Sequence, residues 1–195
     1  HGGWGLKPLS FFDLLNTDWP EEVFVEGGLM SRGDTVIIAA ESKAGKSTLI
    51  MNLVRQLLIG GNFLGFKVAK PLKVLVMQAE IRESRFKDRL IGTYIDIPKK
   101  TLIASHVWNT RGLIMIERDL STIKEYLTDI RPDVLIIDPL INFHGYDENN
   151  ASQMSNLFRK LDLLKAEFLM SLIISQHFRK MIANSKCESL LERVR

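Results

Sequence analysis

Four short apolar runs recur along the chain, at residues 35–39, 73–78, 134–138 and 169–175. Runs of this length are typical of strands and are shorter than most helices. Apolar and polar residues do not alternate within them, which indicates strands that are covered on both faces. We therefore expect four buried strands, whose carboxyl ends lie at Ala39, Gln78, Asp138 and Ser175.

Segments with helical periodicity separate the apolar runs. Lys46 to Leu58 has Leu49, Leu53 and Leu57 on one face, and two glycines follow it. Similar patterns predict helices at about 83–94, 120–130 and 152–167. Alternating strands and helices predict an α/β fold, in which a mainly parallel central sheet carries helices on both faces. Ligands of such sheets bind beyond the carboxyl ends of the strands.

Two parts of the chain have a less regular pattern. Residues 101–118 are ambiguous, because Leu102–Ala104 and Leu113–Ile116 could both be short strands. Near the start, Phe11–Leu15 could form one helical turn or two. The expected organisation is an N-terminal extension, a core, and a C-terminal tail that could belong to a truncated core, at residues 1–22, 23–180 and 181–195.

Composition narrows the class of protein. The 195 residues suit one domain, or a core with a small extension, and 46% of them are hydrophobic. The net charge of +3 permits an anionic partner but does not require one. A single cysteine, Cys187, excludes an intramolecular disulfide and suits a reducing compartment. No apolar run reaches the roughly 20 residues of a membrane span. We therefore expect a cytoplasmic protein without a membrane segment.

The strongest motif lies between the first apolar run and the first helix. Residues 40–47 read Ala-Glu-Ser-Lys-Ala-Gly-Lys-Ser, close to the G-x-x-x-x-G-K-[ST] pattern that holds nucleotide phosphates. The backbone N–H groups of such a loop and the helix that follows bind phosphate oxygens. The alternative is a chance Gly-Lys-Ser in a strand–helix turn. The expected nucleotide contacts are Ala40, Ser42, Lys43, Ala44, Gly45, Lys46, Ser47 and Thr48.

Individual positions in this loop have distinct expected roles. Lys46 would place its charge on the outer phosphates, Ser47 would offer its hydroxyl to Mg²⁺, and Thr48 could contact an inner phosphate. Ala40 replaces the first glycine of the pattern, so the loop requires a negative φ at that position. Glu41 stands where loops of the ParA and MinD type carry a lysine, so that class is rejected.

The ends of the other strands carry candidate catalytic groups. Asp138 could bind Mg²⁺, in the arrangement called Walker B, or merely cap the turn before Pro139. Glu80 could polarise the attacking water, or only begin a helix with a favourable charge. Gln176 could sense the γ-phosphate and is favoured over His177 in that role.

Two cations follow Gln176 and His177. Arg179 and Lys180 could reach a neighbouring subunit's nucleotide or contact DNA, and could equally be solvated surface charges.

Together these blocks resemble the RecA-like ATPases of the wider AAA type, and among them the branch of DnaB-type and RepA-type hexameric helicases. Within residues 74–90, the spacing from Glu80 to Arg89 is similar to that of the DnaB type. The segment Phe63-Leu64-Gly65 is similar to RepA-type members. The blocks that carry the resemblance are residues 40–48, 74–90, 134–140 and 173–180.

This resemblance implies a five-stranded core in which the sensor strand lies between the phosphate-loop strand and the Walker B strand. It also implies a homo-oligomeric ring, such as a hexamer, with ATP and Mg²⁺ at subunit interfaces and DNA, preferably single-stranded, in the channel. The preference for ATP over GTP is likewise implied by the family. The loop at about 142–153, which would face that channel, carries Asp147 and Glu148 and is not basic.

Three functions are consistent with these features. The first is a ring-forming ATPase motor on DNA in replication or mobile-element maintenance, in which Lys46, Glu80 and Gln176 form the catalytic set. The second is an ATP-dependent oligomeric switch or regulator without helicase activity. A small-molecule kinase ranks last, because no acceptor pocket or arginine-bearing lid is evident.

Overall fold

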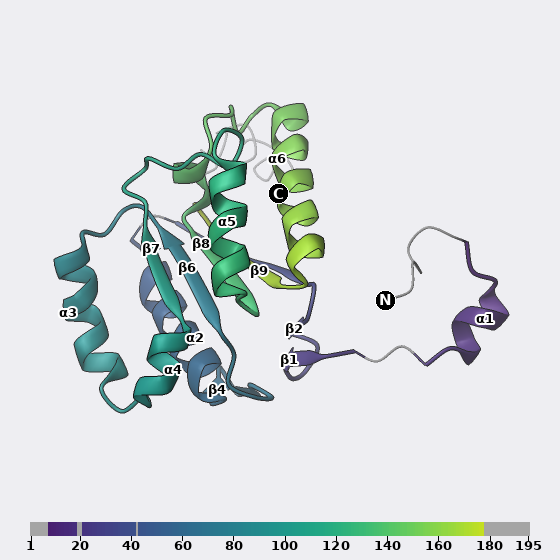
Figure 1. Cartoon of the computed structure of the whole chain (residues 1–195), viewed down its shortest axis with the longest axis horizontal. Coiled ribbons are helices and arrows are strands. Elements are labelled where there is room, and N and C mark those ends of the chain that lie inside the picture. Colours follow the sequence, from purple (N-terminus) through teal and green to yellow (C-terminus); the bar gives the residue numbers. More distant parts are fainter. Residues whose placement is uncertain (1–7, 19–20, 42, 178–195) are drawn as a thin grey trace, which may run out of the picture.

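The core of the molecule is a parallel five-stranded sheet with the order β3-β9-β8-β6-β7. The computed structural model describes residues 8–18, 21–41 and 43–177. The five strands are β3 Thr35–Ala40, β6 Val74–Gln78, β7 His106–Asn109, β8 Val134–Asp138 and β9 Ser171–His177. This order confirms the predicted α/β fold (Figure 1). The strand β9, which is expected to carry the sensor, lies between β3, which precedes the phosphate-loop motif, and β8, which ends at Asp138.

Helices cover both faces of the sheet, because side chains alternate across each strand. In β8, Val134 and Ile136 pack with α2 and α3, whereas Leu135 and Ile137 pack with α5 and α6. The longer helices are α2 Lys46–Ile59, α3 Glu83–Tyr94, α5 Leu120–Ile130 and α6 Ala151–Phe168, and a short 3₁₀ helix, η2, spans Leu140–Phe143. The helix boundaries lie within one residue of those expected from the apolar periodicity.

The ends of α2 and α6 show why the pattern located them so well. Gly45 and Gly60 flank α2 with positive φ angles of 84° and 66°, and the Gly60 N–H bonds to the Gln56 carbonyl. At the start of α6, the Asn150 side chain accepts hydrogen bonds from the Ser152 and Gln153 N–H groups. These are local signals, and they act independently of the rest of the fold.

The strand β3 is less buried than its sequence predicts. Val36 and Ile38 pack against the α2 side of the core, but Ile37 on the opposite face is 52% exposed. Among residues 8–18, 21–41 and 43–177, β3 pairs with β9 alone, which places it at the edge of the described sheet. The prediction of a buried strand at residues 35–39 is therefore wrong for one face, because apolar composition does not report position within a sheet.

Within residues 101–118, neither of the two segments that could have been short strands forms one. Leu102–Ala104 belongs to a helix, α4 Lys99–Ala104, which begins after Pro98. The edge strand β7 follows it at His106–Asn109, and Leu113–Ile116 forms no strand. The short helix forms because the Pro98 carbonyl accepts bonds from the Thr101 and Leu102 N–H groups.

Small elements outside the five-stranded sheet precede β3 or follow α2. They are α1 Phe11–Asn16, the hairpin β1 Val23–Val25 and β2 Met30–Ser31, and the hairpin β4 Asn62–Phe63 and β5 Phe66–Lys67. An isolated β-bridge between Val25 and Val68 joins the β1–β2 hairpin to the residue that follows β5. Figure 1 shows α1 standing away from the sheet, beyond β1.

A charged cluster fastens the first hairpin to the core. Arg32 pairs with Glu22 and with Asp133, and Glu22 also pairs with Lys70. Hydrogen bonds from Arg32 and then Lys70 lower the pKa of Glu22 from 4.5 to about 2, although burial opposes them. The cluster therefore ties β1 to the loop before β8 through an ionised carboxylate.

Glu22→Gln is expected to reduce stability at neutral pH and to flatten its acid dependence. A carboxyl whose pKa is lowered on folding stabilises the protein above pH 4.5, and loses that effect as the pH falls toward 2. The side chain is 40% exposed, so solvent limits the effect to about 0.2–1 kcal/mol. Urea unfolding at pH 7 and pH 3 measures it. Glu26→Gln is the matched control, and an equal effect in both variants would contradict the role of Glu22.

Candidate active site

The loop between β3 and α2 has a backbone that accommodates the residue at the first position of the motif. Ala40 is the last residue of β3 and does not have a positive φ, so an alanine is accommodated there. Among the loop residues that the structure describes, Lys43 and Gly45 are left-handed, with φ angles of 67° and 84°. The left-handed conformation costs about 1–2 kcal/mol for a residue such as Lys43, and the sequence pattern did not predict it. Ser42 lies outside the described residues.

Lys46 begins α2 and is only 7% exposed. Its Nζ donates to the Gln176 carbonyl at 3.0 Å and lies 3.0 Å from His177 Nδ1. Burial lowers the pKa of Lys46, while the carboxylates of Asp138 and Glu80 oppose that shift. A desolvated ammonium at a helix start is suited to bind an anion, since the helix dipole adds to its charge.

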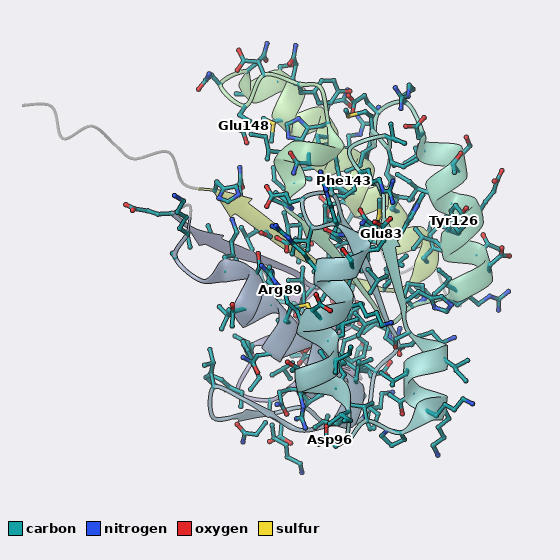
Figure 2. The ribbon with its side chains drawn as sticks, turned by 90° about the vertical axis from the view of Figure 1, so that its left-hand side faces the viewer. Glu83, Arg89, Asp96, Tyr126, Phe143 and Glu148 are labelled. Atoms are coloured by element: carbon teal, nitrogen blue, oxygen red, sulfur yellow. The ribbon has the colours of Figure 1, made fainter. Side chains whose placement is uncertain are left out.

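Ser47 and Thr48 follow in the first turn of α2. Together with residues of α2 and α3 they line a hollow of about 250 Å³, which also contains the Arg89 side chain. Figure 2 shows Arg89 on the side of α3 that faces α2. The expected phosphate contacts of Ser47 and Thr48 therefore lie beside an open space that a further cation, Arg89, also lines.

Asp138 ends β8, opposite Gln78 on β6. Burial raises the pKa of Asp138 and the nearby Glu80 charge adds to this, while Ser175, Lys46 and His177 oppose it. A partly buried carboxylate whose pKa is raised is stabilised in its charged form by a cation. Mg²⁺ prefers oxygen ligands such as those of Ser47 and Asp138. The residues present therefore fit Mg²⁺.

The rest of the metal's ligands need not come from protein. Among the residues that the structure describes, no group of three His, Cys, Asp or Glu side chains could hold a metal by itself. Mg²⁺ usually keeps several waters and takes further ligands from substrate phosphates. The sparse set of protein ligands is therefore consistent with a metal bound together with a nucleotide.

Glu80 lies in the loop after β6, close to Asn142 and His177. Its Oε1 accepts from Asn142 Nδ2 at 3.3 Å and lies 3.9 Å from His177 Nε2. The buried Gln78 side chain bonds to both the N–H and the carbonyl of Ile81. The loop that carries Glu80 is thus held at the next residue, Ile81, which favours a fixed position for this carboxylate.

The sensor strand contributes differently from the expectation. Gln176 meets Lys46 through its backbone carbonyl, whereas the His177 ring lies between Lys46 and Glu80. Sequence reasoning ranked these two residues by type. It placed Gln78 at the end of a strand but gave its side chain no role, and it gave none to Asn142. A buried glutamine at the end of an apolar strand is the signal that could have identified Gln78. Arg179 and Lys180 lie outside the described residues.

The arrangement brings four expected residues to one edge of the sheet. Lys46, Glu80, Asp138 and Gln176 come from the carboxyl ends of different parallel strands or the helix after one. A cation at a helix start can hold phosphate oxygens, and a pair of carboxylates can hold a metal and polarise a water. The geometry is therefore suited to phosphate chemistry.

Comparisons with known proteins agree with this fold. A family model described as an AAA domain matches residues 5–182. No curated protein matches the chain significantly.

Among the solved structures that match is a KaiC-like protein from the hyperthermophilic archaeon Pyrococcus horikoshii. It superposes with a TM-score of 0.54 at 16% identity, over 86% of this chain and 71% of that chain. An identity this low supports the fold alone. Within the described part of the chain, no helix has both the length and the apolar character needed to cross a membrane.

Proposed function

The chain belongs to this AAA domain family and has the fold of a RecA-like P-loop ATPase, and from that premise we propose that it hydrolyses ATP and acts as a ring-forming motor on DNA. The observation that carries hydrolysis is the cluster in which His177 lies between Lys46 and Glu80, beside Asp138. The cluster joins a phosphate-binding cation to a carboxylate that can orient water.

Each residue has a role that follows from its position. Lys46 and the loop N–H groups hold the β- and γ-phosphates, and Ser47 and Asp138 hold Mg²⁺. The bound metal neutralises phosphate charge. Glu80 accepts a hydrogen bond from the attacking water and takes its proton as the new oxygen–phosphorus bond forms. The bond from the γ-phosphorus to the bridging oxygen breaks in the same step, and ADP leaves. Gln176 senses the γ-phosphate. His177 lies between Lys46 and Glu80 and holds these two side chains in place before the nucleotide binds.

Two features support a motor that acts on DNA. The motifs resemble the hexameric helicase branch, in which subunits form a ring around the DNA strand. Arg179 and Lys180 follow the sensor strand β9, where cations could meet phosphates of DNA or of a neighbour's nucleotide. Replication or maintenance of a mobile element is the setting that this resemblance favours.

One observation favours a different function. The loop after β8 carries Asp147 and Glu148, so acidic residues stand where a DNA-facing loop would gain from cations. An ATP-dependent oligomeric switch that recruits a protein partner would not need a basic channel. It would hydrolyse ATP slowly and change its oligomeric state when ATP binds.

Single-stranded DNA is expected to raise ATP turnover several-fold at about 50 mM salt, and the gain is expected to fall steeply by about 200 mM as counterions compete. Steady-state phosphate release with and without DNA measures this. Heparin at equal charge is the control for a general effect of polyanions. No stimulation by any DNA or RNA, together with an ATP-dependent change in oligomer size, would favour the switch.

A further inference from the structure

The Glu80 carboxylate is held on one of its two oxygens. Asn142 Nδ2 donates to Glu80 Oε1 at 3.3 Å, and His177 Nε2 lies 3.9 Å from the same oxygen. The Glu80 side chain is 49% exposed. A glutamate with this exposure has several rotamers of similar energy, and fixing one of them costs conformational entropy. A hydrogen-bond donor at the site can select one rotamer before any nucleotide binds.

Glu80 and Asn142 meet because the strands that precede them are neighbours in the sheet. The strands β6 and β8 pair in parallel, with Gln78 opposite Asp138 at their carboxyl ends. Glu80 lies two residues beyond Gln78, and Asn142 lies four residues beyond Asp138. The contact therefore follows from the order of the strands, although 62 positions separate the two residues in the sequence.

The segment that carries Asn142 is itself firmly held. Asn142 belongs to η2, in which Leu140 and Phe143 are 1% and 0% exposed. The Asn142 N–H donates to the Pro139 carbonyl at 3.2 Å, and the Phe143 carbonyl accepts from the Ile116 N–H at 2.8 Å. Buried side chains at both ends of η2 fix its backbone. The Asn142 amide therefore extends from a rigid support, as a group that orients another side chain requires.

The backbone just beyond η2 is held as well. The Gly145 N–H donates to Glu117 Oε1 at 2.6 Å, and the buried His144 accepts from the Tyr146 N–H through its Nδ1 at 3.2 Å. A Cβ added at Gly145 would lie 3.2 Å from the same Glu117 oxygen, so this close approach favours glycine. These contacts fix the start of the loop after η2 and thereby limit the movement of Asn142.

A neutral donor is a suitable partner for a carboxylate that acts as a general base. An ionised carboxylate only accepts hydrogen bonds, so the Asn142 amide must present its NH₂ group. An arginine or lysine in that place would stabilise the charged carboxylate more strongly and make it a weaker base. The amide occupies Oε1 of Glu80 and leaves Oε2 to accept a proton.

We propose that Asn142 is a positioning residue for ATP hydrolysis, which holds Glu80 so that its Oε2 faces the attacking water. The inference rests on the proposed function, in which Glu80 takes a proton from that water. The proton passes to Oε2 as the oxygen–phosphorus bond forms and the bond to the bridging oxygen breaks, while Asn142 stays neutral and unchanged. Asn142 acts through Glu80, so it contributes to turnover and not to the affinity for ATP.

Asn142→Leu removes the donor and keeps the approximate size of the side chain. In the full chain, this variant is expected to lower kcat for ATP hydrolysis about 10–100-fold and to leave KM within about two-fold, because only the chemical step depends on the orientation of Glu80. Asn142→Ala is the second variant in case leucine disturbs η2, and thermal unfolding checks that each is folded. Asn156→Ala, at an exposed asparagine on α6, is the matched control.

Two further readouts separate positioning from a structural role. In a Glu80→Gln background, Asn142→Leu is expected to cause less than about two-fold further loss of turnover, since the base that it orients is absent. The second readout is the Asn142 side-chain NH₂ resonances in ¹⁵N spectra, which are identified by their absence from Asn142→Leu. These resonances are expected to shift in Glu80→Gln and not in Glu83→Gln, with no nucleotide present.

Each outcome supports or overturns the role of Asn142. A loss of kcat that disappears in the Glu80→Gln background, together with NH₂ resonances that respond to Glu80→Gln, supports it. Full turnover of both Asn142 variants, a loss that multiplies with that of Glu80→Gln, or resonances that do not respond overturns it. A parent chain that does not hydrolyse ATP would refute the proposed function and this role with it, whereas the preceding results in an active parent refute the role of Asn142 alone.

Discussion

Lys46→Ala is expected to lower ATP turnover by at least 10²–10³-fold and to weaken ATP binding. The side chain is the buried cation of the site, and its Nζ lies within 3.0 Å of both the Gln176 carbonyl and His177 Nδ1. Its pKa is lowered mainly by burial, because the ammonium has lost water molecules that its protein neighbours do not fully replace as hydrogen-bond partners. A phosphate would supply that replacement, and alanine removes the group that gains from it.

Two measurements separate this role from a structural one. Turnover is followed by phosphate release, and binding by titration with ATP in the presence of Mg²⁺. Lys67→Ala is the matched control, since Lys67 is an exposed lysine on β5 that lies 3.9 Å from Glu26. Thermal unfolding checks that the variant is folded. Turnover of Lys46→Ala within a factor of two of the parent would contradict the assignment.

The elements that sequence predicts best are those that local signals define. The helix α2 lies between two glycines with positive φ angles, and the N-cap of α6 is the side chain of Asn150. Central strands were equally clear, because β6 and β8 are buried on both faces and consist of continuous apolar runs. In each case the residues of the element itself carry the information.

The features that sequence missed depend on neighbours far away in the chain. The exposure of Ile37 follows from the edge position of β3, which only the pairing with β9 determines. The strand β7 has no apolar run, and it forms because Leu75 to Gln78 offers a free edge. A pattern of a few neighbouring residues contains no information on which strands pair, so it predicts neither the exposure of Ile37 nor the strand β7.

The same distinction holds within the site. The loop motif identified Lys46 because strand, loop and helix are contiguous there. The contact of His177 with both Lys46 and Glu80 depends on β9 extending to residue 177 beside β3. The bracing of Ile81 by Gln78 likewise depends on a turn whose shape the sequence does not specify. Residue type suggested the chemistry, and the fold determined which atoms meet.

Glu80→Gln is expected to preserve ATP binding and to lower turnover by about 10²–10⁴-fold. Glutamine has nearly the same shape, and its amide oxygen can still accept the hydrogen bond from Asn142 Nδ2. It cannot take a proton from water, which is the role proposed for the carboxylate. The loop that holds residue 80 should be unaffected, because Gln78 bonds to Ile81 and not to Glu80.

The charge that this variant removes also bears on the metal site. The Glu80 carboxylate helps to raise the pKa of Asp138, so Glu80→Gln should leave Asp138 more readily ionised and Mg²⁺ binding no weaker. Slow turnover with intact binding of ATP and Mg²⁺ would therefore assign Glu80 to the chemical step. Glu83→Gln is the matched control, because Glu83 is an exposed carboxylate three residues further on that pairs with Arg111. Full activity of Glu80→Gln would refute the role, and equal losses in both variants would point to the loop instead of the carboxylate.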